Sequence, residues 1–519
     1  MAIGARPWFL SSSSGALATA VIVGMFVLRL GFLGLPELIP EEAYYWLYSQ
    51  HLSPGYLDHP PMVGWLIALG TGVFGHNEFG VRIGALLTWS VAAFFLFRLG
   101  CELFDRERAW LAVALFSILP IFAGIGFTIA PDSPLFAAWS AALYFLYRAA
   151  IENRAGAWYW LGCAVGVGML SKYTIVLIAP ATLLVLILNR SSRHWLLKPQ
   201  PYVAGLISVV IFSPVVFWNA THGWASFVFQ GPRRFAMPTH FALHLFVLDM
   251  MMLVTPTALV ASCVVLQEWW KERGRVLSDA RLSPRVIFVC CAALVPIVVF
   301  GTLSLRHVGK LNWSGPAFIP LLPCLADQIV SFSPGGAARW RVILHKSWRP
   351  TFVILAAAYL VVLTYLGPGI PFVGFSEKSK RFIGWGNMGQ QIVALNDQIA
   401  AQTGERAIVV GMDKHNISSE LAFYARAEGS QAAEQVVGRD SFGMESLMFR
   451  YWDREVSLEG KTLLLVARKE SELRGEAITR WFRSVDAPKE IVTTRHGKRV
   501  GRYFYRIGRQ FRDGRREVE

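Results

Sequence analysis

Long apolar runs separated by short polar links dominate the first 370 residues of this 519-residue chain. A helix needs about 20 apolar residues to cross about 30 Å of hydrocarbon. Eleven runs approach or exceed that length, and we expect each to form a membrane-spanning helix. The runs lie at 16–35, 79–98, 108–129, 132–148, 157–170, 174–188, 201–218, 241–266, 285–303, 314–331 and 351–367.

Two other features of this pattern need an interpretation. The run at 62–75 is short and follows Pro60 and Pro61, so we interpret it as an interfacial helix that does not cross. The first run follows Arg6, as in a signal peptide, but no small-residue cleavage pattern precedes the next polar stretch. We therefore expect an uncleaved first helix.

The links differ in charge, and this difference predicts orientation, because Lys and Arg gather on the cytoplasmic side. One set of alternate links carries seventeen basic residues and the other carries five. The first set is predicted to be cytoplasmic, which places the N-terminus in the cytoplasm and the C-terminus outside. The five residues of the outer set are Lys172, Arg233, Arg234, Arg306 and Lys310.

Composition supports a polytopic membrane protein, since 54% of the residues are hydrophobic and only 16% are charged. The net charge of +15 could suggest nucleic-acid binding, but most basic residues lie in the short links. We therefore predict no nucleic-acid partner. The six cysteines lie in or beside apolar runs, which indicates neither a disulfide framework nor a CxxC metal site.

The sequence changes character after about residue 376. Short β-type runs lie at 407–412, 462–467 and 502–507, with helical patterns around 387–402 and 418–427. This alternation predicts a small α/β domain on the outer face. We expect two domains, a transmembrane domain at 1–375 and an α/β domain at 376–519.

Candidate chemistry begins in the stretch IPEEAYYWLYSQHLSPGYLDHPP at 39–61, which is acidic and aromatic in a basic chain. Glu41 and Glu42 follow Pro40, so they could simply stabilise a helix N-terminus. Alternatively, one of them is a general base. The corner at Asp58 and His59 is either a rigid turn before two prolines or a place where His59 meets a phosphate.

Other outward links also carry polar side chains at the membrane edge. Asp132 could be a helix cap or a second acidic group, and Lys172 could extend to the interface or bind a lipid phosphate. Arg233 and Arg234 suit anion recognition, and the link at 305–316 adds Lys310 and Asn312. We expect these side chains to line one external cavity.

Several ordered motifs resemble one known family. They are PEEAYYW, GYLDHPPM, FGHNEFGVRIG, APDSPLFAAW, GMLSKYT, VVFWNATHGWASFVFQ and LNWSGPAFIPLLP. The chain resembles the bacterial GT-C glycosyltransferases of the branch that contains protein O-mannosyltransferase-like enzymes and lipid A aminoarabinose transferases. The resemblance implies a GT-C fold with about 11–13 transmembrane helices and a small C-terminal periplasmic α/β domain.

The family's site residues transfer by motif. The resemblance implies that Glu41 or Glu42 is the base, although the family commonly has Asp at the first position. Asp132 matches the second acidic residue, and Lys172 matches a lysine implicated in binding the carrier phosphate. His59 replaces a lysine of the aminoarabinose transferases. We assign Arg233 and Arg234 to the phosphate as well, and Tyr44, Tyr45, Asp58, Lys310 and Asn312 to the acceptor cavity.

The resulting hypothesis is a polyprenyl-phosphate-dependent glycosyltransferase of the bacterial inner membrane that works at the periplasmic face. Its partners would be an undecaprenyl-phosphate-linked sugar, a lipid A or other cell-envelope acceptor, and membrane lipids. One displacement with inversion would suffice, because a lipid phosphate is a good leaving group. No cofactor is certain, and a divalent metal between the external carboxylates is possible. The alternatives are a flippase or transporter of lipid-linked sugars and a receptor or scaffold.

Overall fold

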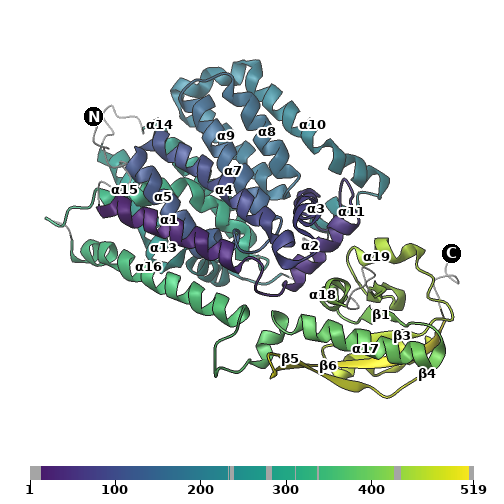
Figure 1. Cartoon of the computed structure of the whole chain (residues 1–519). Coiled ribbons are helices and arrows are strands. Elements are labelled where there is room, and N and C mark those ends of the chain that lie inside the picture. Colours follow the sequence, from purple (N-terminus) through teal and green to yellow (C-terminus); the bar gives the residue numbers. More distant parts are fainter. Residues whose placement is uncertain are drawn as a thin grey trace, which may run out of the picture. The chain divides into compact units, whose positions relative to one another are not determined.

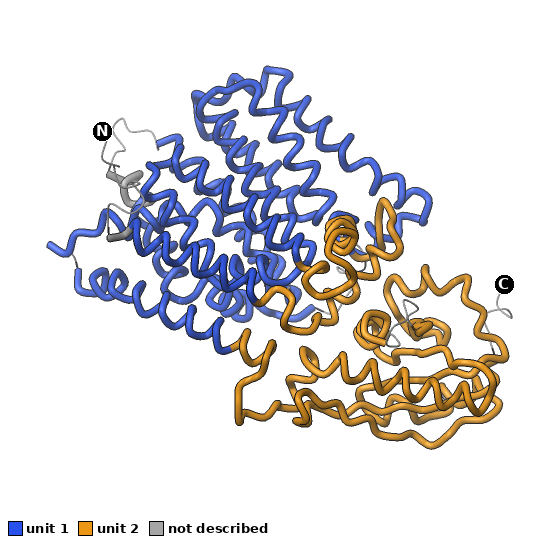
Figure 2. Tube along the Cα trace, in the orientation of Figure 1, with its two compact units in different colours: residues 1–31, 59–63, 83–361 blue, residues 32–58, 64–82, 362–519 orange. Residues whose placement is uncertain are grey.

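A computed structural model describes residues 13–231, 233, 239–275, 283–309, 311–335, 338–425 and 434–512 as a helical protein with a small C-terminal sheet (Figure 1). The chain divides into two compact units (Figure 2). Unit 1 comprises Met1–Gly31, His59–Val63 and Ile83–Val361, and unit 2 comprises Phe32–Asp58, Gly64–Arg82 and Val362–Glu519. The domain boundary at residues 375 and 376 stays a prediction.

Helices form most of unit 1, and local sequence sets their ends. Asp105 caps a helix by accepting a hydrogen bond from the backbone N–H of Arg108 at 2.9 Å. Pro199 and Pro284 occupy the first turns of two others. The elements are α1 (Ser13–Phe32), α4 (Glu78–Leu103), α5 (Arg106–Ile118), α6 (Pro120–Gly124), α7 (Asp132–Leu146), η2 (Tyr147–Ile151), α8 (Ala157–Met169), η3 (Tyr173–Leu177), α9 (Ile178–Leu188), η4 (Arg190–Leu197), α10 (Pro199–Thr221), α11 (Ala225–Gln230), α13 (Leu243–Arg275), α14 (Pro284–Leu303), η5 (Leu311–Leu321), α15 (Leu322–Val330) and α16 (Arg339–Leu366). Three of these helices, α1, α4 and α16, extend into unit 2.

Seven helices in the described part of the chain are long and apolar enough to cross a membrane. An eighth results if Tyr173–Leu188 and Arg190–Leu197, which are bent by 117°, count as one span. The prediction of a polytopic helical membrane protein is thus confirmed. The seven spans are Gly15–Phe32, Glu78–Leu103, Asp132–Ile151, Pro199–Thr221, Leu243–Trp269, Pro284–Leu303 and Arg339–Leu366.

Four of the eleven predicted runs do not form one long helix, which is why fewer helices pass this test than the sequence suggested. One of them, the run at 174–188, divides into η3 and the eleven-residue α9 of the bent pair. The run at 108–129 breaks into α5 and α6, because Leu119 before Pro120 has an extended backbone. The run at 314–331 divides into the 3₁₀ helix η5, which contains two prolines, and the short α15. The run at 157–170 is the thirteen-residue α8.

Unit 2 contains a six-stranded sheet of order β2-β1-β3-β6-β4, with β5 paired to β6. The strands β2, β1 and β3 are parallel, and the others pair antiparallel. The predicted α/β character of this region is confirmed. Its elements are α2 (Pro40–Gln50), α3 (Met62–Phe74), η6 (Glu377–Arg381), α17 (Trp385–Thr403), β1 (Ile408–Gly411), α18 (Asn416–Tyr424), β2 (Val436–Val437), η7 (Arg439–Phe442), α19 (Phe449–Trp452), η8 (Asp453–Glu455), β3 (Leu463–Ala467), η9 (Glu470–Leu473), α20 (Glu476–Thr479), β4 (Phe482–Val485), β5 (Lys489–Arg495) and β6 (Lys498–Phe511), where the first two residues of α3 belong to unit 1.

Apolar residues on alternate positions of the strands make two cores, one on each face of the sheet. Val409 and Leu464 pack with residues of α17 and α18. Their neighbours Val410 and Leu465 pack on the opposite face with Phe482. The helix α3 forms as predicted from the run at 62–75, and at thirteen residues it is too short for a full span. Its interfacial position stays a prediction.

Candidate active site

The acidic pair lies in the first turn of α2, in unit 2. Ile39 has an extended backbone, and Pro40 follows as the first helical residue. The carboxylate of Glu42 turns back to accept a hydrogen bond from the backbone N–H of Ile39 at 3.1 Å. This capping arrangement fixes the start of the helix, so the helix-terminus interpretation applies to Glu42.

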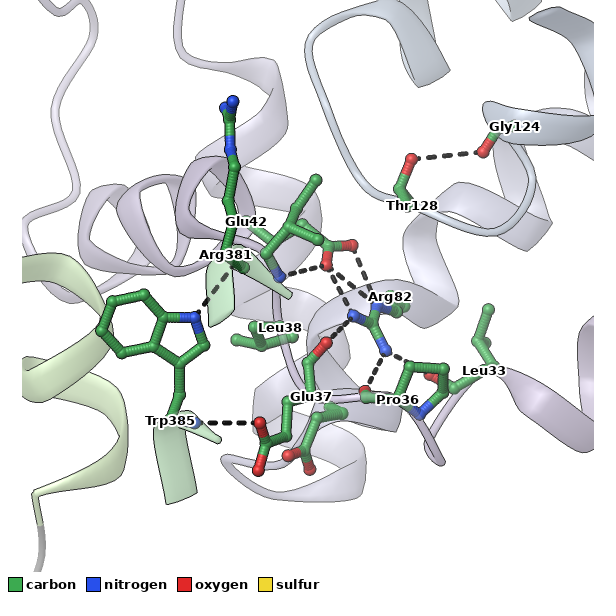
Figure 3. Close-up of polar contacts among 12 residues, drawn as sticks. Leu33, Pro36, Glu37, Leu38, Glu42, Arg82, Gly124, Thr128, Arg381 and Trp385 are labelled. Atoms are coloured by element: carbon green, nitrogen blue, oxygen red, sulfur yellow. Dashed lines mark hydrogen bonds and ion pairs between the residues drawn. The ribbon is translucent and has the colours of Figure 1, made fainter. Parts of the chain in front are cut away.

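Arg82 holds the same Glu42 carboxylate in a buried ion pair (Figure 3). The guanidinium donates to both carboxylate oxygens, with its Nη2 at 2.6 Å from Oε2 and its Nε at 2.9 Å from Oε1. It also donates to the backbone carbonyls of Leu33, Pro36 and Glu37, at 3.1, 2.6 and 2.8 Å. Glu42 is 0% exposed, so its carboxylate organises the segment at 33–42 and does not face a reactant.

Glu41 has a different environment from its neighbour. Its side chain is 40% exposed and forms an ion pair with Arg381 of η6, with 2.6 Å between Nη2 and Oε1. An exposed carboxylate can exchange such a partner at little cost, because an exposed ion pair contributes about 1 kcal/mol or less. The structure therefore gives the two adjacent carboxylates different environments, whereas sequence alone did not decide which of them is the base.

Asp58 anchors the aromatic face of α2. It accepts hydrogen bonds from the hydroxyls of Tyr44 and Tyr48, at 2.9 and 2.6 Å. Burial, helped by the Asp58 carboxylate, raises the pKa of Tyr44 well above its ordinary value, which keeps its hydroxyl protonated as a donor. Tyr45 is 8% exposed and packs against both tyrosine rings. Tyr44, Tyr45 and Asp58, which were predicted to line the acceptor cavity, thus form a buried network with Tyr48.

A second polar cluster lies in unit 1. The ammonium of Lys172 lies 2.9 and 3.0 Å from the two carboxylate oxygens of Asp132. The side-chain amide of Asn312 donates to the same carboxylate at 2.6 Å. Asp132 begins α7, Lys172 lies between α8 and η3, and Asn312 belongs to η5. Three predicted site residues from separate links thus meet, and both charged side chains are buried.

The other predicted phosphate-binding residues have varied surroundings. His59 is buried in unit 1, at the start of the segment His59–Val63. Arg233 is exposed, with its guanidinium carbon 4.9 Å from the centre of the Phe229 ring. Arg234 and Lys310 lie outside the described residues. The expectation that all these residues share one cavity stays a prediction.

Sequence reasoning missed Glu420, a buried acid on α18. Neither of its carboxyl oxygens has a hydrogen-bond partner among the described residues, and the residue is 0% exposed. Burial is the main cause that raises the pKa of Glu420 well above its ordinary value, and the carboxylates of Glu37, Glu42 and Glu41 add to this effect. Burial and these neighbouring carboxylates therefore favour the protonated form of the Glu420 carboxyl group. Its only sequence signal is a lone charge in the otherwise uncharged helix NISSELAFY.

The carboxylates named for a possible metal do not suit one. Glu42 is bound by Arg82, Glu41 by Arg381, and Asp132 by Lys172 and Asn312. Across the described residues there is also no group of three or more His, Cys, Asp or Glu side chains that could hold a metal ion. The mechanism proposed below uses no metal.

Comparison with solved structures identifies the fold. The chain superimposes on the crystal structure of ArnT from Cupriavidus metallidurans in the apo state with a TM-score of 0.62, at 14% identity, covering 95% of this chain and 98% of that one. The same enzyme bound to undecaprenyl phosphate gives a TM-score of 0.60. The chain thus has the fold of ArnT, in agreement with the fold that its sequence resemblance implied.

Sequence comparison shows which proteins with a related sequence the chain is similar to. Residues 58–218 match the family described as dolichyl-phosphate-mannose-protein mannosyltransferase. The undecaprenyl phosphate-α-4-amino-4-deoxy-L-arabinose arabinosyl transferase of Pseudomonas savastanoi pv. phaseolicola is 27% identical over 63% of each chain. A lipid A galacturonosyltransferase of Rhizobium johnstonii is 26% identical over 41% of this chain and 45% of its own length. Within the GT-C class, the chain is thus similar to the lipid A aminoarabinose transferases, and it spans slightly less than two thirds of the length of these arabinosyl transferases.

Proposed function

We propose that this multi-pass membrane protein is a glycosyltransferase that moves a sugar from undecaprenyl phosphate to lipid A or a similar envelope acceptor. The observation that carries the proposal is the fold shared with ArnT over nearly the whole chain. The activities for which the similar arabinosyl transferases and the galacturonosyltransferase are named support the donor and acceptor classes. The unequal environments of Glu41 and Glu42 support a specific base.

In the proposed reaction, Glu41 removes the proton from an acceptor hydroxyl. The acceptor oxygen forms a bond to the anomeric carbon as the bond from that carbon to the phosphate oxygen breaks, with inversion. The electron pair leaves with undecaprenyl phosphate, which needs no proton because a phosphate monoester is stable as an anion. Glu41 suits this role because its carboxylate is accessible and its ion-pair partner, Arg381, is itself an exposed arginine.

Lys172 is proposed to bind the donor phosphate, together with Arg233 and Arg234. In the structure its ammonium is paired with Asp132, so phosphate would share or replace that carboxylate. Asp132 would then hold Lys172 in position until the donor arrives, and Asn312 would keep Asp132 oriented. Tyr44, Tyr45 and Asp58 support α2, and we propose that they shape the acceptor site through that helix. His59 adds a further candidate donor to the phosphate.

We also propose a topology in which the N-terminus is cytoplasmic and the residues of the predicted α/β domain are periplasmic. The unequal distribution of seventeen and five basic residues between the two sets of links supports it.

The function is tested with purified full-length protein in detergent, undecaprenyl phosphate-linked sugars and lipid A. We expect the carrier to lose its sugar only when acceptor is present, with a matching mass increase in lipid A. Sugars to be compared include aminoarabinose and galacturonic acid. Intact donor lipid after incubation, combined with its movement across vesicles containing the protein, would instead identify a flippase.

A further inference from the structure

A polar cavity of about 300 Å³ lies within unit 1, away from the residues discussed so far. It is formed by the ends of α13 and α15 and the starts of α14 and α16. The helix α14 has 20 residues and is therefore about 30 Å long. Arg285 at its start lines the cavity, whereas Asn312 follows its other end. The cavity thus belongs to the end of the helices whose links are rich in Lys and Arg.

The two carboxylates that line the cavity are both neutralised by arginines. Glu268 forms an ion pair with Arg341 at 2.6 Å. Asp327 forms one with Arg108, which also donates to the hydroxyl of Ser331. Neither acid therefore presents an uncompensated negative charge to a ligand.

Arg285 is the cation of this cavity that has no acidic partner among the described residues. Its Nη1 donates to the carbonyl of Leu103 at 2.7 Å, and its guanidinium lies 4.4 Å from the centre of the Phe104 ring. Its Nε is buried without an acceptor. A buried donor without an acceptor is unfavourable, because it has lost its hydrogen bond to water. An anionic ligand would supply both the missing acceptor and the counter-charge.

The remaining walls suit a ligand that is anionic at one end. Gln328 and the exposed hydroxyl of Ser333 add polar groups. Trp269 and Trp348 add indole rings, and the ring of His345 stacks on Phe332 at 4.3 Å. Aromatic residues are typical of the membrane–water interface, and basic pockets between membrane helices bind lipid headgroups there.

We propose that this cavity binds an anionic, phosphate-bearing ligand through the guanidinium of Arg285, in a role separate from glycosyl transfer. Two sources share this chemistry. One is the headgroup of an anionic phospholipid, and the other is a soluble phosphate compound. A charge-assisted hydrogen bond from Arg285, flanked by Arg341, fits either source.

The test measures binding of three probes to purified full-length protein in neutral detergent. Native mass spectrometry and thermal unfolding would follow phosphatidylglycerol, zwitterionic phosphatidylcholine and inorganic phosphate. Binding of phosphatidylglycerol alone identifies a lipid site, and binding of inorganic phosphate as well identifies a site open to soluble phosphates. No binding of either anion, or equal binding of phosphatidylcholine, overturns the proposal.

Variants connect the binding to this cavity. Arg285→Gln should raise the dissociation constant for the anionic probe about tenfold or more. Arg190→Gln, which removes an exposed arginine at the start of η4 outside the cavity, should leave that constant unchanged. Equal binding by wild type and Arg285→Gln would overturn the assignment.

A second pair of variants avoids the packing of Arg285 on Phe104. Ser333 is exposed and lines the cavity, so it can be replaced without disturbing the core. Ser333→Glu should weaken binding of the anionic probe several-fold through charge repulsion, whereas the similarly sized Ser333→Gln should not. Equal effects of both substitutions would count against an anion site.

Discussion

At the scale of single residues, the adjacent Glu41 and Glu42 show how position along a helix turn decides the chemistry available to a carboxylate. Successive residues of a helix point in different directions. Here one side chain points into the Arg82 network and the other reaches Arg381. The same residue type therefore serves a structural role at one position and is open to reactants at the next.

Substitution of the two glutamates should separate these roles. Glu41→Gln should reduce the transfer rate about 10²–10⁴-fold with little change in melting temperature, because it removes a general base. Glu42→Gln should destabilise the fold by about 3–5 kcal/mol, because Arg82 keeps a buried charge without its counterion. Initial rates and thermal unfolding measure the two effects. A fully active Glu41→Gln enzyme would remove Glu41 as the base.

Asp132 and Lys172 make a related pair of predictions. Lys172→Ala should raise KM for the lipid donor, because a phosphate contact is lost, with a smaller effect on kcat. Asp132→Asn should release Lys172 from its carboxylate, so it should lower KM for the donor if Lys172 binds phosphate. Steady-state kinetics with varied donor concentration measure both. An unchanged KM in both variants would contradict the phosphate role of Lys172.

Glu420 makes a prediction about stability and pH. An acid whose pKa is raised in the folded state contributes full stability below its unfolded pKa, and that stability is lost as pH rises towards the folded pKa. The wild type should therefore lose stability from about pH 4.5 upwards, and Glu420→Gln should be more stable at neutral pH. Melting temperatures between pH 4 and pH 8 measure the difference.

Glu455→Gln is the control for this series, because Glu455 is exposed and in the same unit. It should reproduce the pH dependence of the wild type. Equal melting temperatures of wild type and Glu420→Gln throughout the range would show that Glu420 finds a partner in solution.

At the scale of elements, the start of α17 depends on a residue far away in sequence. The carboxylate of Glu37 accepts hydrogen bonds from the backbone N–H groups of Gly384, Trp385 and Gly386, at 2.6, 3.0 and 3.2 Å. Figure 3 shows the contact with Trp385. A negative charge at this position satisfies N–H groups that a helix start leaves without partners, and it favours the helix dipole. Gly384 has a φ of 96°, which glycine adopts readily.

Loss of this cap should loosen the first turn of α17 selectively. Glu37→Ala should accelerate hydrogen exchange at these amides about tenfold or more, since each hydrogen bond to a charged group contributes about 1.5–3 kcal/mol. Glu377→Ala, which removes a more exposed glutamate paired with Lys380, is the control and should leave them unchanged. Exchange measured by mass spectrometry decides between these outcomes, and equal rates in all three proteins would exclude the cap.

Sequence patterns predicted where helices and strands form, but they did not predict which side chains contact one another. Pro40 with two acidic residues indicated the start of α2, and short apolar runs of β type indicated β1 and β3. The ion pairs Glu42–Arg82 and Glu41–Arg381 join residues that are 40 and 340 positions apart. Pairing across such separations depends on tertiary packing, which no local pattern encodes. The runs at 108–129 and 314–331 misled because their hydropathy is that of a span. Pro120 separates α5 from α6, and Pro316 and Pro320 lie in the 3₁₀ helix η5.

At the scale of the whole molecule, the distribution of Lys and Arg among the links predicts one orientation of the chain in the membrane. Reporter fusions at residue 193, in a basic link, should report the cytoplasm, and fusions after residue 512 should report the periplasm. Cysteine labelling in intact cells provides an independent check. Cytoplasmic signals from both positions would contradict the proposed topology and, with it, a periplasmic reaction.

The partners of the segment at 33–42 are synthesised at very different times. Arg82 is made about 40 residues after Glu42, whereas Gly384 follows Glu37 by 347 residues. At about 5–20 residues per second, the second interval lasts on the order of tens of seconds. The Arg82 network can hold this segment in shape throughout that wait, so that the late-emerging α17 meets a carboxylate already in place. In a nascent chain lacking Arg82, α17 would meet a Glu37 carboxylate that is not yet held in position.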